Sequence, residues 1–184
     1  MKKLLAIAAT TALLIACRDQ TTKGNAAANV SAANSEAPAN AVASANPLGA
    51  PVDAATAKKL MHERHEAMEK IGKATKSASR ELKSDAPNMD AVKAAAATIA
   101  QASQNVGTLF PPGSGPEAGK THALPAVWEK PEDFAAKAHD FQQAATAFDA
   151  AAKSGDVAAT KARFEALGKT CKACHDGYRA KDKD

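Results

Sequence analysis

Apolar residues recur at steps of three, four and seven from residue 53 onward, which is the spacing of one face of an α-helix. The first stripe consists of Leu60, Arg64, Met68, Ile71, Ala78 and Leu82. Asp53 is a suitable N-cap for this helix, and Asp85-Ala86-Pro87 ends it. After a second cap, Asn88, the next stripe consists of Val92, Ala95, Ile99, Ala102 and Val106. The pattern therefore predicts two helices joined by a short turn, the second of which ends at Gly107.

Proline and glycine occur between residues 109 and 125 too densely for regular structure, so this stretch is predicted to be a long connection. Four apolar side chains in and just after it are expected to fold back over one end of the core: Phe110, Leu124, Val127 and Trp128. Helical spacing then returns. The third helix begins near Pro131 and carries Phe134, Ala138, Phe141, Ala145 and Phe148. The fourth follows the cap Asp156 and carries Phe164, Leu167, Cys171, Cys174 and Tyr178.

Four amphipathic helices with short joints at residues 83–88 and 154–156 predict an all-α fold, an antiparallel four-helix bundle over residues 53–184. The composition agrees, because alanine is abundant and the chain contains one Trp and one Tyr. The net charge of +4 is too small and too dispersed for a surface that binds nucleic acid.

The first 52 residues differ in composition from the bundle. Lys2 and Lys3 precede an apolar run that is too short to span a bilayer, so residues 1–16 are predicted to be a signal peptide. The run ends in Leu14-Ile15-Ala16-Cys17, which resembles a bacterial lipobox and implies cleavage before Cys17 and lipidation of its thiol. An ordinary signal peptide cut after Ala16 would leave Cys17 free. Residues 17–52 are rich in Ala, Asn, Ser and Pro and lack aromatic residues, so we expect a flexible tether.

Near its C-terminus the chain carries the sequence Cys171-Lys172-Ala173-Cys174-His175. Each thiol of such a pair can form a thioether to one haem vinyl group, and the adjacent imidazole can reach the iron. A zinc site would need further Cys or His ligands at finger-like spacing, and a thioredoxin-type pair would follow β-strands. The sequence therefore predicts one covalent haem c, attached through Cys171 and Cys174 with His175 as iron ligand. Both cysteines lie on a core stripe, where the many alanines leave room for a macrocycle.

Three segments together resemble the cytochrome c-prime family, the class II c-type cytochromes. They are Cys171-Lys172-Ala173-Cys174-His175-Asp176-Gly177-Tyr178-Arg179, the stretch Arg64-His65-Glu66-Ala67-Met68-Glu69-Lys70-Ile71-Gly72, and the joint from Leu109-Phe110 to Leu124-Pro125-Ala126-Val127-Trp128. The likeness covers about residues 53–184, and the lipobox would make this a lipoprotein-type member. The resemblance implies His175 as proximal ligand, Arg179 near the proximal face and Arg64 near a haem propionate. Members often form homodimers through their first two helices, which the mixed outer faces here neither favour nor exclude.

Met68 occupies the position on which the function depends. In this family the residue at this position either covers an open sixth coordination site or ligates the iron through its thioether. A six-coordinate His/Met haem exchanges electrons with redox partner proteins, whereas a five-coordinate haem binds nitric oxide or carbon monoxide. The segment Met68-Glu69-Lys70-Ile71-Gly72 resembles the low-spin members, so we expect electron transfer and keep gas binding as the alternative. An enzyme is not expected, because no acid, base and nucleophile converge in the sequence.

The signal peptide and the covalent haem together predict a periplasmic protein. A lipid on Cys17 would hold it to a bacterial membrane. Arg18 is not the Asp that favours retention at the inner membrane in some bacteria, and this favours the outer membrane.

Overall fold

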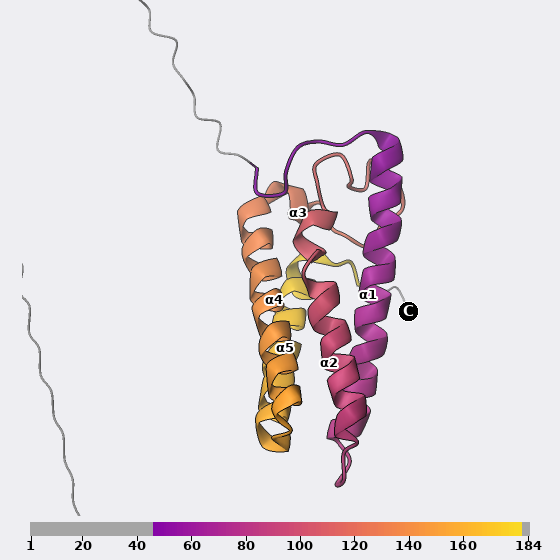
Figure 1. Ribbon diagram of the computed structural model, residues 1–184. Helices are drawn as coiled ribbons and strands as arrows, with labels where there is room; N and C mark the ends of the chain where they lie inside the picture. Colours follow the sequence, from indigo (N-terminus) through magenta and orange to yellow (C-terminus); the bar gives the residue numbers. More distant parts are fainter. Residues whose placement is uncertain (1–45, 182–184) are drawn as a thin grey trace, which may run out of the picture. The chain divides into compact units, whose positions relative to one another are not determined.

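Four long helices form most of residues 46–181, the part of the chain that the computed structural model describes (Figure 1). They are α1 (Ala54–Leu82), α2 (Met89–Ser103), α4 (Pro131–Ser154) and α5 (Val157–Tyr178). A 3-10 helix, η1 (Val106–Leu109), and a single turn, α3 (Ala126–Glu129), lie in the long connection between α2 and α4. Helix α1 packs on α2, α2 on α4 and α4 on α5. The predicted all-α four-helix bundle is therefore confirmed.

Polar side chains cap the helices where the sequence predicts. The carboxylate of Asp53 accepts hydrogen bonds from the backbone N–H groups of Ala55 and Thr56, at 2.9 and 3.0 Å. Asn88 and Asp156 accept equivalent bonds at the starts of α2 and α5. Each cap satisfies backbone donors that have no partner inside the helix, which fixes where the helix begins.

The end of α2 differs from the prediction. The α-helix stops at Ser103, and the chain continues as the tighter turn η1 instead of as α-helix to residue 106. Asn105 and Gly107 both have low helix propensity, which accounts for the early end. The 3-10 turn still buries Val106, which is 5% exposed, so the core position predicted for this side chain is kept.

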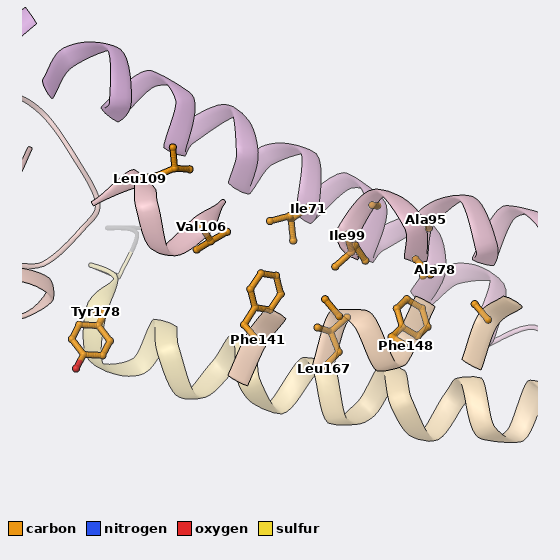
Figure 2. Packing of buried hydrophobic residues seen from close by; sticks show 14 of the residues in the cluster. Ile71, Ala78, Ala95, Ile99, Val106, Leu109, Phe141, Phe148, Leu167 and Tyr178 are labelled. Atoms are coloured by element: carbon orange, nitrogen blue, oxygen red, sulfur yellow. The ribbon is translucent and has the colours of Figure 1, made fainter. Parts of the chain in front are cut away.

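The apolar stripes of the helices meet in one core. Figure 2 shows Ile99 of α2, Phe148 of α4 and Leu167 of α5 pointing toward one another, and all three are at most 1% exposed. Alanine occupies many of the remaining positions, and five alanines are completely buried: Ala57, Ala78, Ala96, Ala145 and Ala152. Such small side chains occupy little of the space between the helices.

The connection between α2 and α4 folds back over the core, as predicted. Phe110 and Val127 are buried. The indole N–H of Trp128 donates to the carbonyl oxygens of Phe110 and Pro111, at 3.1 and 3.0 Å. The Phe110 ring meets Phe134 edge to face, with the ring centroids 4.8 Å apart. These contacts fix the irregular segment against the first turn of α4.

The segment before α1 corrects our expectation of a tether up to residue 52. Leu48 is 5% exposed and belongs to the core cluster. The N–H of Val52 donates to the carbonyl oxygen of Pro112 at 3.0 Å. Gly113 has a φ of +84°, and a Cβ atom there would lie 2.8 Å from the carbonyl oxygen of Val52. Residues 46–52 therefore form a strap that packs on the bundle, because a single leucine reaches the core and a glycine lets the two backbones approach.

The predicted signal peptide (residues 1–16), Cys17 and the predicted tether up to residue 45 lie outside the described residues. Within residues 46–181, none of the helices combines the length and the apolar character needed to cross a membrane.

Candidate functional site

The two predicted haem cysteines lie near the C-terminal end of α5. Both thiols are free and half-buried, and both side chains pack against the hydrophobic core cluster. Leu167, one turn before Cys171, is 1% exposed and belongs to the same cluster. His175 is the next residue after Cys174 and is exposed. Helix α5 thus turns two thiols toward the core and places an imidazole on the adjacent flank.

The electrostatics of the thiols argue against a redox-active cysteine pair. Burial raises the pKa of both Cys171 and Cys174. Nearby Lys137 lowers the pKa of Cys174, whereas Cys171 and Asp133 raise it further. A reactive Cys-x-x-Cys pair has a lowered thiol pKa, because the thiolate is the nucleophile. The environment here instead keeps both sulfurs as neutral thiols.

A zinc site is disfavoured by the surroundings of the same cysteines. No group of three Cys, His, Asp or Glu side chains in the described part of the chain is arranged so that it could hold a metal ion. A structural zinc site needs four such ligands at tetrahedral spacing. An iron bound here would therefore take most of its ligands from a group other than the protein.

His175 is suited to serve as a neutral ligand. Although His175 is exposed, desolvation by neighbouring atoms lowers its pKa, and the charge of Arg179 lowers it further, while Asp176 acts in the opposite sense. The neutral imidazole is the form that coordinates metals. Arg179 directly follows α5, is itself exposed, and its backbone N–H donates to the carbonyl oxygen of His175 at 3.1 Å.

Contacts from two other segments hold the end of α5. The carbonyl oxygen of Tyr178 accepts a hydrogen bond from the N–H of Leu124 at 2.9 Å. The N–H of Ala180 donates to the carbonyl oxygen of His122 at 2.8 Å. The hydroxyl of Tyr178 donates to the carboxylate of Asp133 in the first turn of α4. The last turn of α5 is therefore fastened both to the α2–α4 connection and to α4.

Arg64 is buried and bound by the connection. Its side chain is 4% exposed, and its guanidinium donates to the carbonyl oxygen of Ser114 through both terminal nitrogens, at 2.9 Å each. One of these nitrogens also donates to the Ser114 hydroxyl at 3.1 Å and to the Leu109 carbonyl oxygen at 3.4 Å. The guanidinium carbon lies 4.8 Å from the Phe110 ring centroid and 5.8 Å from that of Trp128. Burial lowers the pKa of Arg64, and Glu117 partly opposes this.

Met68 borders the same core as the cysteines but belongs to a different helix. Its side chain is half-buried and packs against the same cluster that Cys171 and Cys174 contact. Met68 comes from α1 and the cysteines from α5, two helices that make almost no direct contact with each other. Two thioether-forming thiols, an imidazole and a thioether around an alanine-rich core are a donor set that fits a c-type haem.

Sequence analysis missed two of the polar side chains that shape this region. Ser114 is completely buried and binds Arg64, but it lies in a run of prolines and glycines that gives no periodic signal. Asp133 binds Tyr178, although the sequence indicates only an acidic first turn of a helix. The remaining four histidines are exposed: His62, His65, His122 and His139.

Comparison with known proteins identifies the family of the chain. The family model for cytochrome C' matches residues 59–179. Among curated proteins, cytochrome c-554 of Cereibacter sphaeroides is 44% identical over 75 residues, which are 40% of this chain. The match covers 56% of that relative, so the chain spans little more than half of its length.

Solved structures match over more of the chain. Cytochrome c' from Thermochromatium tepidum is 31% identical with a TM-score of 0.64, covering 72% of this chain and 100% of the other. The nitric oxide complex of a cytochrome c prime mutant from Alcaligenes xylosoxidans is 28% identical with a TM-score of 0.61. It covers 68% of this chain and 97% of the other.

Proposed function

The chain belongs to the cytochrome c' family and carries covalent haem c, and from this premise we propose that it is an electron-transfer protein with Met68 as an iron ligand. We assign the two thioether bonds to Cys171 and Cys174 and the proximal iron bond to His175. When bound, the haem supplies an iron that can gain or lose one electron or take up a diatomic gas.

The choice of electron transfer rests on the position of Met68 relative to the two cysteines. Met68 and the two cysteines border the same core cluster from α1 and α5. A methionine side chain is long, flexible and neutral, so it can reach an iron from a helix face without adding charge. Ligation by methionine in addition to histidine is the arrangement of electron-carrying cytochromes.

The positions of two arginines, Arg64 and Arg179, also support the proposed haem site. Arg64 is buried, and although the charge of Glu117 acts on it from a distance, none of the described carboxylates lies within ion-pair distance of its guanidinium. A buried cation is costly unless an anion compensates it, so a haem propionate would complete its surroundings. Arg179 lowers the pKa of His175, which places its positive charge within range of the proximal ligand. A cation at that position favours the ferrous over the ferric iron.

Gas binding is the second candidate function. It is favoured by the solved relative from Alcaligenes xylosoxidans, which is a nitric oxide complex. In that case Met68 would be an apolar lid over an open coordination site, a role that its partial burial also permits.

The deciding experiment replaces Met68 with Ala and records optical spectra with and without carbon monoxide. If Met68 is a ligand, the parent is low-spin and takes up carbon monoxide slowly, while Met68→Ala becomes high-spin and takes it up rapidly. Met61→Ala is the matched control, because Met61 lies on the same helix against Gly119 and should leave the spectra unchanged. A parent that binds carbon monoxide at once, with spectra that Met68→Ala does not alter, would instead establish the gas-binding function.

The proposed location is the periplasm, with a lipid on Cys17 as the membrane anchor. Cys17→Ser should then release the haem protein from the membrane fraction into the soluble periplasm. Continued recovery of that variant with the membrane would disprove the lipid anchor.

A further inference from the structure

We propose that Asp133 is a positioning residue for the haem site: through Tyr178 it holds the last turn of α5, from which His175 projects. The proposal rests on His175 as the iron ligand. It assigns a role to a side chain of α4, a helix that supplies none of the proposed haem ligands.

The end of α5 needs support from outside the helix. Gly177 lies in its last turn, where a glycine weakens a helix by about 1 kcal/mol relative to alanine. Arg179 already has an extended backbone, with φ −118° and ψ 131°. Without other contacts such a terminus would fray, and His175 lies within it, one turn before the helix ends.

Tyr178 connects this terminus to α4. Its ring is 6% exposed and meets Phe134 edge to face, with the ring centroids 5.2 Å apart. Its hydroxyl donates to the carboxylate of Asp133. Because Tyr178 follows His175 by three residues, fixing the tyrosine fixes the turn of helix from which the imidazole projects.

Four single variants of the holoprotein test this role. Asp133→Asn removes the charge but keeps an oxygen that can accept the tyrosine hydrogen bond. Asp133→Ala removes both, and Tyr178→Phe removes only the hydrogen bond. Asp140→Asn is the matched control, because it removes an exposed carboxylate from the same helix. The measurements are amide hydrogen exchange of residues 171–181 and the haem midpoint potential.

Exchange at the end of α5 should accelerate in Tyr178→Phe and Asp133→Ala but not in Asp133→Asn or Asp140→Asn. The midpoint potential should shift in the same two variants by more than in Asp133→Asn, because only in those two is the turn that carries His175 held less firmly. Parental exchange in both Tyr178→Phe and Asp133→Ala, or a parental midpoint potential in both, overturns the proposal. Haem that leaves the parent polypeptide on extraction would disprove covalent attachment, and the exchange comparison would still test the role of Asp133.

Discussion

Replacing Arg64 with Met tests whether the buried guanidinium fixes the α2–α4 connection. Methionine keeps an apolar stem of similar length in the core stripe of α1 but has no donor for the Ser114 carbonyl oxygen. That oxygen accepts two hydrogen bonds at 2.9 Å from Arg64, and Ser114 itself is completely buried. The substitution therefore leaves a buried acceptor without these donors.

The expected loss can be worked from the contacts of Arg64. A buried acceptor left without its donor destabilises the folded state by about 1–3 kcal/mol. The cation–π contacts with Phe110 and Trp128 contribute about 0.5–2 kcal/mol more. Removing a buried charge also removes its desolvation penalty, which offsets part of this loss. We therefore expect the free energy of unfolding to fall by about 2–4 kcal/mol, a large share of the roughly 5–15 kcal/mol of an ordinary domain.

Urea denaturation followed by far-UV circular dichroism measures this change. Arg80→Met is the matched control, because Arg80 is an exposed arginine of the same helix and its loss should change stability by no more than about 0.5 kcal/mol. If Arg64→Met matched Arg80→Met, the hydrogen bonds to Ser114 would contribute nothing to stability, and the assignment of Arg64 as an anchor would be refuted.

Two further substitutions test the strap and the end of α5. Leu48→Ala should reduce the free energy of unfolding by about 2–4 kcal/mol in urea titrations, because Leu48 is buried in the core; a loss below about 0.5 kcal/mol would show that residues 46–52 do not stabilise the bundle. Burial and the bond to Asp133 raise the pKa of Tyr178 to about 12, above the ordinary value of about 10 in an unfolded chain. Its contribution is therefore complete below pH ~10 and is lost as pH rises to ~12. The parent should lose stability over this interval relative to Tyr178→Phe, and parallel pH profiles of the two proteins would contradict the assignment.

Helix positions could be predicted from the sequence because their signals are local. Asp53, Asn88 and Asp156 cap the helices in the structure through bonds to backbone groups two or three residues away. The apolar stripes are equally local, because one face of a helix depends only on the spacing of its own residues. A four-helix bundle follows from four such stripes joined by short turns.

The strap could not be predicted by the same reasoning. Residues 46–52 include one leucine and no periodic pattern, so their composition resembles that of the segment before them. What holds them is a distant partner, since Val52 binds Pro112 and only a glycine at position 113 allows the approach. A contact between two segments some 60 residues apart cannot be predicted from the spacing of apolar residues within either segment.

The proposed haem site depends both on local spacing and on contacts between distant segments. The apolar stripes indicate that Met68 and Cys174 each face a core, but only the packing of the helices shows that the two residues face the same core. Helices α1 and α5 are each paired with a different neighbour, α2 and α4, and those two pack on each other. Figure 2 shows α1 and α5 on either side of the core cluster, which Met68 and Cys174 both border. The thioether of Met68 and the proposed haem attachment site, from segments about 100 residues apart, are therefore brought to one core by the topology of the bundle, which no single stripe encodes.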